Sequence, residues 1–420
     1  MNINQEVKLA AIKAKEASIK LRQLSTEVKN RTLKQMARAL VANASYIIKA
    51  NKLDIKTAKK SGLKESFIDR LSLDKDRIRQ MSACLKEVAA QEDPVGNVVS
   101  STKRPNGLQI MKVRTPLGVI GVIYESRPNV TSDCIGLCLK SGNAIILRGG
   151  SSAIHSNMAI FDVLNKIALK NGLPEGAISI VRTTDRKAVR FLLKEEKYID
   201  LIIPRGGESL IKEVIKYSKI PVVKHYKGLC HAYVDEYADL NMAAKIVLNA
   251  KLQRTSVCNA IETLLVHRRI AGRFLPLMVK SLKDQGAEVR GCIETCNILK
   301  GQINKATQKD WETEYLDKII SIKVINSIDD AIAHIDRYSS GLSEVIITDS
   351  CESAEYFLNR VDSACVYLNA STRFTDGNQF GLGAEIGIST GRMHARGPMG
   401  VAELTSYKYV IIGNGQVRTK

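Results

Sequence analysis

Short apolar segments alternate with amphipathic helices along most of this 420-residue chain. The predicted strands lie at residues 117–124, 144–147, 178–181, 201–203, 221–223, 263–266, 319–324, 344–347 and 364–368. Helix-like segments such as 131–140 and 152–171 separate them. Strands that alternate with helices in this way form parallel sheets covered by helices. The pattern therefore predicts an α/β fold, with a second α/β stretch that starts near Ala232 and no flexible linker between the halves.

The first ninety residues differ, because they show a helical spacing of apolar residues without strands. Ser25, Thr26 and Glu27 form a capping signal in front of apolar residues that recur from Leu33 to Ile48 at spacings of three and four. This spacing predicts one helix over that stretch.

Basic residues outnumber acidic ones, with 63 Lys and Arg against 43 Asp and Glu, so the formal net charge is +20. The first hundred residues alone hold 20 basic and 11 acidic side chains. A nucleic-acid-binding protein is one explanation, but aromatic residues make up only 5% and no motif of that class occurs. We expect most of the charge to lie on solvated helix faces and a smaller part to serve small anions.

A hairpin interrupts the alternation at Pro105-Asn106-Gly107, a turn signal between residues 98–100 and 108–113. Residues 407–412 form a further predicted strand that can join it. Such an arm either pairs with the sheet of another subunit or remains a local edge hairpin, and both alternatives stay open.

Several classes of protein are disfavoured by composition. No apolar run approaches the length that spans a bilayer, and lysines interrupt the apolar residues of the N-terminus. The nine cysteines are odd in number and lack a Cys-x-x-Cys pair, and no His-Glu-x-x-His occurs. We therefore expect a cytoplasmic protein with reduced thiols, without a membrane segment and without a metal site.

Two predicted strands end in an arginine followed by paired glycines: Arg148-Gly149-Gly150 and Arg205-Gly206-Gly207. Each precedes a predicted helix, where free backbone amides and the helix dipole can hold a phosphate. Neither matches Gly-x-Gly-x-x-Gly, so each alone is also compatible with a plain turn. Together, on one sheet, they favour an anionic nucleotide at its carboxyl edge.

Cys258 lies in a polar segment, residues 253–259, between a helix-like run and a strand. A nucleophilic thiol needs partial exposure and groups that stabilise its thiolate, and Arg254 is such a group. Asn129 follows the strand at 117–124, where its amide can donate to a developing oxyanion. A packing cysteine and an ordinary loop asparagine are the alternatives.

Long motifs around these residues resemble one enzyme family. They lie at residues 121–131, 137–150, 254–265, 369–377, 380–385 and 394–400. They resemble the γ-glutamyl phosphate reductase (glutamate-5-semialdehyde dehydrogenase) family of the aldehyde dehydrogenase superfamily. The resemblance implies a parallel-sheet cofactor domain, an α/β catalytic domain and a β-hairpin oligomerisation arm. It also implies NADPH-dependent reduction of L-glutamyl 5-phosphate to L-glutamate 5-semialdehyde with release of phosphate, the second step of proline biosynthesis.

Carried over residue by residue, the resemblance makes Cys258 the nucleophile that forms a thioester and Asn129 the oxyanion donor. Glu314 matches the glutamate that contacts the nicotinamide ribose, and Arg148 falls where a lysine usually faces the adenosine ribose. A fixed charge there suits the 2′-phosphate of NADP. The remaining cofactor-binding candidates are Gly149, Gly150, Arg205, Gly206 and Gly207. From position and chemistry, the candidates for substrate anions are Arg254, His231 and Arg373, and a surface or structural role is the alternative for each.

The chain departs from ordinary aldehyde dehydrogenases, which use a glutamate ahead of the nucleophile to activate water. No glutamate occurs between Ser218 and Cys230. A thioester that is reduced or phosphorolysed needs no such base. The bulky residues at 224–228 and Thr255, where the family commonly has proline, are departures from the reductases themselves.

The resemblance predicts the domain boundaries. Residues 1–97 and 114–225 would form the NADP-binding domain, 226–403 the catalytic domain and 98–113 with 404–420 the arm; alternatively, the later part of 226–403 returns to the cofactor domain. We expect a homo-oligomer, a dimer or tetramer, and an association with glutamate 5-kinase. A CoA-acylating aldehyde dehydrogenase remains the alternative enzyme, because it would also lack the hydrolytic glutamate.

Overall fold

The computed structural model describes residues 2–63, 65–223 and 227–418. The chain forms two compact units. Unit 1 comprises Met1–Lys224, Gly381–Ile388 and Pro398–Lys420, and unit 2 comprises His225–Phe380 and Ser389–Gly397. Within the described residues, no helix is long and apolar enough to cross a membrane.

Unit 1 is built on a four-stranded parallel sheet with the order β5-β4-β3-β6. The strands are β3 (Val119–Tyr124), β4 (Ala144–Gly149), β5 (Ile178–Ile180) and β6 (Leu201–Arg205). Every residue of β3 and β4 is buried. The chain proceeds from β3 outward to β5 and then returns to β6 on the other side of β3, so the strand order reverses there. Ligands of open α/β sheets bind beside such a reversal, at the carboxyl ends of the strands.

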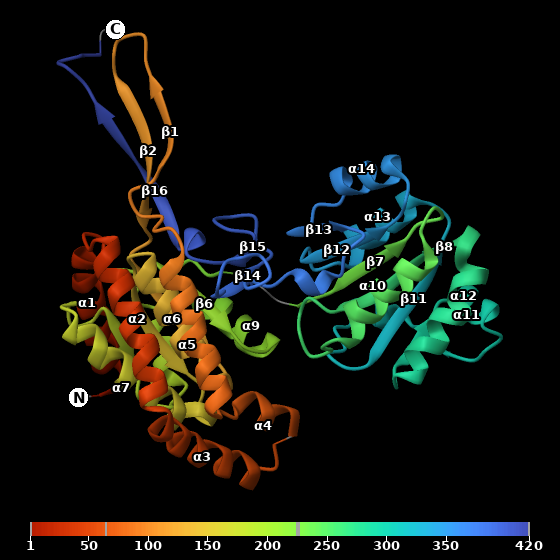
Figure 1. Ribbon diagram of the computed structural model, residues 1–420, viewed down its shortest axis with the longest axis horizontal. Helices are drawn as coiled ribbons and strands as arrows, with labels where there is room; N and C mark the ends of the chain where they lie inside the picture. Colours follow the sequence, from red (N-terminus) through yellow and green to blue (C-terminus); the bar gives the residue numbers. More distant parts are fainter. Residues whose placement is uncertain (1, 64, 224–226, 419–420) are drawn as a thin grey trace. The chain divides into compact units, whose positions relative to one another are not determined.

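Helices cover this sheet (Figure 1). Those of unit 1 are α1 (Ile3–Leu21), α2 (Thr26–Ala42), α3 (Ala44–Lys60), α4 (Glu65–Leu71), α5 (Lys75–Ala90), α6 (Asn129–Lys140), α7 (Ile154–Lys170), α8 (Lys187–Leu192) and α9 (Glu208–Tyr217). α6 lies against β3 and β4, α7 lies against β5, and both are covered in turn by α2. α1 lies against β4 and contacts α8.

The single helix predicted over 25–48 is wrong in one respect. Ser25 does cap α2, since its side chain accepts from the amide of Val28. However, the helix ends at Asn43, whose φ of −103° and ψ of 18° break the helical path before α3 begins at Ala44. The apolar spacing continues across the break because both helices bury residues against the same layer.

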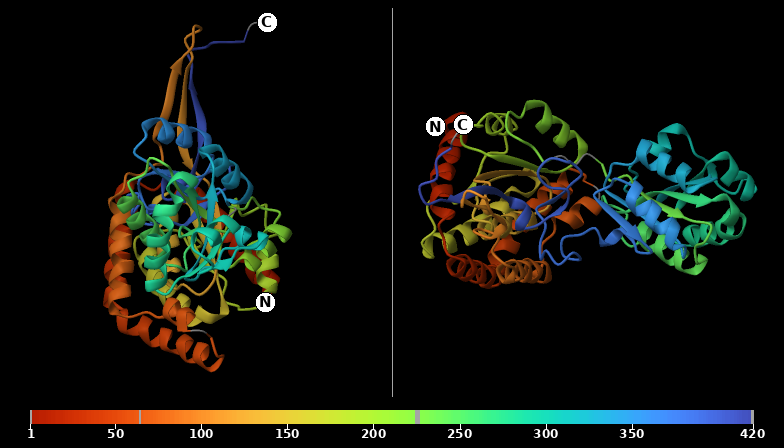
Figure 2. Two further views of the ribbon diagram at one scale, coloured as in Figure 1. Left: turned by 90° about the vertical axis from the view of Figure 1, so that its right-hand side faces the viewer. Right: turned by 90° about the horizontal axis from the view of Figure 1, so that it is seen from above.

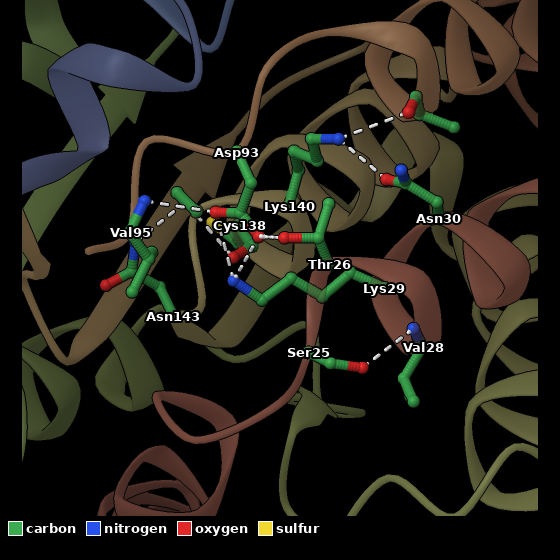
Figure 3. A network of polar contacts seen from close by, with 12 residues as sticks. Ser25, Thr26, Val28, Lys29, Asn30, Asp93, Val95, Cys138, Lys140 and Asn143 are labelled. Atoms are coloured by element: carbon green, nitrogen blue, oxygen red, sulfur yellow. Dashed lines mark hydrogen bonds and ion pairs between the residues drawn. The ribbon is translucent and has the colours of Figure 1, made fainter. Parts of the chain in front are cut away.

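Two lysines of this helical layer are buried, unlike most of the basic side chains expected there. Lys29 lies 2.9 Å from Asp93, which also accepts from Thr26 (Figure 3). Lys140 donates to Asn30 at 2.6 Å and to the carbonyl of Ala89. Burial lowers the pKa of Lys140. These contacts tie α2, α5 and α6 together through charges that a folded chain must pair.

The predicted hairpin is confirmed as β1 (Val98–Lys103) and β2 (Gln109–Pro116), which pair antiparallel. β16 (Thr405–Ile412) pairs antiparallel with β2 along its whole length, so the C-terminal strand joins the hairpin as expected. The three-stranded sheet projects from the helices of unit 1 (Figures 1 and 2). All six residues of β1 are exposed.

Unit 2 is built on a seven-stranded sheet with the order β10-β9-β11-β8-β7-β12-β13, in which each strand is parallel to its neighbours. The strands are β7 (Cys230–Val234), β8 (Ile261–His267), β9 (Glu288–Gly291), β10 (Asn304–Lys305), β11 (Ile319–Ile325), β12 (Ser343–Ile347) and β13 (Cys365–Leu368). The helices are α10 (Leu240–Leu252), α11 (Arg268–Asp284), α12 (Ile293–Ile298), α13 (Ile328–Tyr338) and α14 (Cys351–Arg360). The α/β pattern predicted from the sequence is thereby confirmed.

Short elements complete the chain: η1 (Ser151–Ala153), η2 (Gln308–Glu312), η3 (Thr372–Phe374), η4 (Ala402–Leu404), β14 (Gly387–Ser389) and β15 (Gly397–Met399). The strand predicted at 221–223 is wrong as a full strand. Only an isolated bridge joins Val222 to Ile202, because Pro221 offers a carbonyl but no amide hydrogen to β6.

Candidate active site

In unit 1 the two predicted glycine turns and the end of β3 meet at the carboxyl edge of the sheet. The amide of Glu125, just past β3, donates to the carbonyl of Arg205 at 3.0 Å. The amide of Gly207 donates to Oε2 of Glu125 at 3.1 Å, and the amide of Gly150 donates to the carbonyl of Tyr124 at 2.8 Å. The structure thus brings both turns together beside the reversal of strand order, as a nucleotide site requires.

Gly149 is the position in these turns where a side chain has the least room. A Cβ there would lie 2.2 Å from Nδ2 of Asn157, which is buried. Asn157 accepts through Oδ1 from Thr131 at 3.2 Å, so it is fixed from α6. Glycine therefore lets β4 end close against α7.

The guanidinium of Arg148 lies against the loop that follows β5, at Thr184 and Asp185. Its side chain is 7% exposed, and Nη2 donates to the carbonyls of Thr184 at 3.0 Å and Asp185 at 3.4 Å. Its Nε is buried and has no hydrogen-bond partner among the described residues. Burial, and secondarily Arg186, lower the pKa of Arg148. A buried cationic donor without an acceptor fits an anionic group at this edge of the sheet.

A basic cavity of about 650 Å³ lies beside the loop that Arg148 contacts. Its lining residues are Asp185, Arg186, Lys187, Arg190, Lys212, Glu213, Lys216 and Tyr217. Five of these eight carry positive charge. Sequence reasoning missed the cavity, because α8 and α9 that form it are separated by a strand.

Arg205, the last residue of β6, is partly buried and lies 3.7 Å from Glu385 of the same unit. Its contact with a late segment of the chain was not anticipated from the glycine turn. Arg205 also acts electrostatically on Asp133, where its positive charge opposes the rise in pKa that burial causes.

Asn129 is the first residue of α6 and is exposed. Its Nδ2 donates to Oδ2 of Asp133, one helical turn later, at 2.8 Å. The turn that leads into α6 contains Ser126 with a φ of +48°, a left-handed conformation that is uncommon for a residue with a side chain. The exposed side-chain amide of Asn129 therefore lies just beyond the carboxyl end of β3.

In unit 2 the candidate residues lie at the amino edge of the sheet, in the segments that lead into its strands. Gly228 precedes β7, Cys258 precedes β8 and Glu314 precedes β11. Parallel strands place their amino ends at one edge, so these residues lie together. Cys258 is partly exposed, and its carbonyl accepts from the buried thiol of Cys230 at 3.3 Å.

Arg373 belongs to the electrostatic surroundings of Cys258. Burial lowers the pKa of Arg373, while the charges of Asp376 and Cys258 act to raise it and Arg254 acts to lower it. Arg373 also donates through Nη1 to Asn259, the residue after the cysteine, and through Nε to Gln253 at 2.9 Å. A positive charge on this side stabilises a thiolate at Cys258.

The two other substrate candidates differ in accessibility. Arg254 is exposed in the turn that carries Cys258. His231 is 1% exposed, and its Nδ1 lies 3.1 Å from Oε2 of Glu344. Its ring contacts that of His334 edge to face, with centroids 5.5 Å apart.

Glu314 and Gly228 are joined by a hydrogen bond that the sequence did not indicate: the amide of Gly228 donates to Oε1 of Glu314 at 3.0 Å. Gly228 lies against the backbone of Cys258, since a Cβ on it would be 2.0 Å from the Cys258 carbonyl oxygen. Of the unusual segment 224–228, residues 224–226 lie outside the described residues. Thr255 is partly buried in the turn.

The sequence also showed no sign of a buried ion pair next to the amino edge of the unit 2 sheet. Lys251 on α10 donates to Oε2 of Glu262 on β8 at 2.5 Å, and both side chains are almost fully buried. Burial raises the pKa of Glu262 to about 7 and lowers the pKa of Lys251. Oε1 of Glu262 also accepts from the amide of Leu316 at 3.4 Å. The pair thereby anchors the turn that carries Glu314.

Comparison with known proteins places this geometry in a family. A model of the aldehyde dehydrogenase family matches residues 3–290. A γ-glutamyl phosphate reductase of Caldanaerobacter subterraneus subsp. tengcongensis is 58% identical over 413 residues, which cover 98% of this chain and 100% of that protein. A γ-glutamyl phosphate reductase of Moorella thermoacetica is 53% identical and is covered completely, as is this chain.

Solved structures agree. The crystal structure of γ-glutamyl phosphate reductase from Thermotoga maritima matches with a TM-score of 0.96 at 47% identity, over 99% of this chain and 100% of that one. An acetylating aldehyde dehydrogenase from Geobacillus thermoglucosidasius shares the fold at 16% identity, with a TM-score of 0.71. The aldehyde-dehydrogenase-like α/β fold expected from the motifs is therefore confirmed. The chain belongs to the aldehyde dehydrogenase family and, within it, to the γ-glutamyl phosphate reductases.

Proposed function

We propose that the protein uses NADPH to reduce L-glutamyl 5-phosphate to L-glutamate 5-semialdehyde with release of phosphate, the second step of proline biosynthesis from glutamate. Identity of 52–58% to γ-glutamyl phosphate reductases along nearly the whole chain supports this reaction. The observation that carries the chemistry is the placement of Cys258, partly exposed in a turn where Arg373 lies within electrostatic reach.

The reaction proceeds through a thioester on Cys258. Its thiolate attacks the acyl phosphate carbonyl, forming a C–S bond while the carbonyl electron pair moves to oxygen. We assign the donor to this oxyanion to the Asn129 amide, as the resemblance to the family implies, and one such donor contributes about 3 kcal/mol to the transition state. Phosphate leaves with the electron pair of its C–O bond. When bound, a nicotinamide cofactor would supply the hydride for reduction of the thioester. The thiohemiacetal on Cys258 then releases the aldehyde as its C–S bond breaks, and the electron pair of that bond returns to the sulfur as the thiolate.

The absence of a water-activating glutamate between Ser218 and Cys230 suits this sequence of steps. A base that activated water there would divert the thioester to the free acid. In the described part of this segment, Gly228 brings backbone rather than a side chain against Cys258.

Membership of the aldehyde dehydrogenase family implies a nicotinamide cofactor, and we assign its binding to the carboxyl edge of the unit 1 sheet. Gly149, Gly150, Gly206 and Gly207 are our candidates for contact with its diphosphate, next to Arg205, because glycine lets a ligand approach the backbone closely. The partnerless Nε of Arg148 and the basic cavity beside Asp185 support NADP, because the 2′-phosphate adds two negative charges to the adenosine half. Glu314 would accept from the nicotinamide ribose.

Arg254 and Arg373 are our candidates for the phosphate and the α-carboxylate of the substrate. For His231 a substrate contact stays a prediction, because its side chain is enclosed beside Glu344.

We further assign cofactor binding to unit 1, catalysis to unit 2 and oligomerisation to the arm. Apolar side chains remain exposed on the arm: Val98, Val99, Tyr407, Tyr409, Ile411 and Ile412. Pairing with another copy in a homodimer or homotetramer would cover them. An association with glutamate 5-kinase would shorten the path of the reactive acyl phosphate.

The acyl acceptor tests the function. In the oxidative direction, purified protein with glutamate semialdehyde and NADP should form NADPH when inorganic phosphate is added. Coenzyme A in place of phosphate should give no turnover. Turnover with coenzyme A and none with phosphate would instead show a CoA-acylating enzyme.

A further inference from the structure

The amide of Asn129 needs a fixed orientation if it is to donate to an oxyanion. A side-chain amide has a donor end and an acceptor end, and rotation by half a turn exchanges them. With the acceptor end turned toward the oxyanion, Asn129 would repel the charge that it is meant to stabilise. Because Asn129 is exposed at the start of α6, packing does not settle this choice.

A carboxylate next to the amide does settle it. Oδ2 of Asp133 accepts from Nδ2 of Asn129 at 2.8 Å. An ionised carboxylate has acceptors only, so the opposite orientation would place two oxygens against each other. The same nitrogen keeps a second hydrogen, for which the described residues hold no acceptor. Asp133 therefore selects the donor end of Asn129 and leaves one N–H available.

Asp133 is itself anchored from two sides. Ser132 donates to its Oδ1 at 3.2 Å and also to the carbonyl of Asn129 at 2.8 Å. The thiol of Cys84, on α5, donates to Oδ1 at 3.5 Å. The amide of Asn129 is thus linked through Asp133 to the packed pair of α5 and α6.

Burial and hydrogen bonds have opposite effects on the ionisation of Asp133. Burial raises the pKa of Asp133, and the hydrogen bonds from Asn129, Cys84 and Ser132 act in the opposite direction. The charge of Arg205 also favours the ionised form. Asp133 is partly buried, and a carboxyl there without a hydrogen-bonded cation among the described residues costs desolvation free energy.

We propose that Asp133 is a positioning residue that orients the Asn129 amide for oxyanion stabilisation. The proposal rests on the proposed function, in which Asn129 is the oxyanion donor. Asp133 touches neither substrate nor cofactor and acts only through Asn129.

A double-mutant cycle tests it. Asn129→Ala should lower kcat by about 100-fold or more. Asp133→Leu, which keeps the shape but removes the acceptors, should lower kcat by about 10-fold or more with KM for both substrates nearly unchanged. The double variant should be about as slow as Asn129→Ala alone, because Asp133 has nothing to orient once the amide is gone.

A conservative variant and a control complete the experiment. Asp133→Asn can offer Nδ2 as well as Oδ1 to Asn129, so it no longer selects the donor end of the amide. It should also lower kcat, although less than Asp133→Leu, and it keeps the test decisive if Asp133→Leu does not fold. Cys351→Ala, at an exposed cysteine on α14, is the control and should keep kcat.

The possible failures are distinguishable. If Asn129→Ala is impaired but its effect multiplies with that of Asp133→Leu, the positioning role is wrong and the donor role stands. If Asp133→Asn and Asp133→Leu both keep wild-type kcat, the carboxylate does not orient the amide and the proposal is also wrong. If Asn129→Ala has full kcat, the donor role fails and the positioning role fails with it.

Discussion

The amide of Gly228 donates a hydrogen bond to the carboxylate of Glu314 at 3.0 Å. Gly228 in turn lies against the backbone of Cys258, because a Cβ at this position would be 2.4 Å from the Cys258 Cα. The glutamate assigned to the nicotinamide ribose thus also holds the segment that supports the nucleophile. The position of Cys258 therefore depends on a residue without a side chain at 228.

Replacing Gly228 by Ala should lower kcat by at least about 10-fold, since the new methyl group meets backbone atoms that cannot rotate away and Cys258 must shift. Gly272→Ala is the matched control: Gly272 lies in α11, and outside its own helical turns no described residue would approach a Cβ there within 4 Å. This control should keep kcat and gain up to about 1 kcal/mol of stability. Wild-type kcat in Gly228→Ala would contradict the close contact.

Arg373 should control the reactivity of the Cys258 thiol. Arg373→Gln removes the positive charge and keeps a hydrogen-bonding side chain, so the thiolate loses a stabilising partner. We expect alkylation of Cys258 by iodoacetamide at neutral pH to slow by about 10-fold. Mass spectrometry of the Cys258 peptide measures this rate, with Arg268→Gln, a surface variant on α11, as the control. Equal alkylation rates in all three proteins would show that Arg373 does not stabilise the Cys258 thiolate.

The elements and the main candidate residues could be predicted because their signals are local. Cys258 lies in a polar turn, and the Pro105-Asn106-Gly107 turn lies within one continuous stretch of sequence. Arg148 and Arg205 could be placed at one edge because carboxyl ends of parallel strands share it. Asn43 could not be recognised as a helix break, because the apolar spacing continues through it.

The contacts between distant residues could not be predicted. Glu314 meets Gly228 across 86 positions, and Glu344 meets His231 across 113. No spacing rule reaches that far. Asp133 lies only four residues after Asn129, on the same helix face, so the i,i+4 rule for helices could have found it. The role of Asp133 in orienting the Asn129 amide could be recognised only from the hydrogen bond between the two side chains.

His334 should contribute to acid sensitivity. Burial lowers its pKa to about 2, and its ring packs against Trp311 and Tyr338. The unfolded chain binds a proton at this position near pH 6.5, whereas the folded chain does not. The free energy of unfolding should therefore decrease as pH falls below about 6.5, by up to about 1.4 kcal/mol per pH unit from this residue.

His334→Asn removes this titration and can keep an acceptor near Nζ of Lys323. Its urea midpoint should fall less steeply than that of the wild type between about pH 7 and about pH 5. Parallel curves for the two proteins would show that His334 is protonated in the folded state.

Arg148 should determine the preference for NADPH. Arg148→Met removes the charge and the orphaned Nε while it keeps a long side chain. We expect KM for NADPH to rise by about 10-fold and KM for NADH to change little, because only NADPH carries the 2′-phosphate. Arg79→Met on α5, whose side chain is mostly exposed, is the control. An equal rise in both KM values would mean that Arg148 contacts a group present in both NADPH and NADH, and not the 2′-phosphate.

The most direct test concerns the thioester on Cys258. It follows NADPH formation from L-glutamate 5-semialdehyde with and without inorganic phosphate, in the wild type and in Cys258→Ala. The wild type should need phosphate for turnover, and Cys258→Ala should form no NADPH under either condition. Turnover of the wild type without phosphate, or activity in Cys258→Ala, would contradict the mechanism.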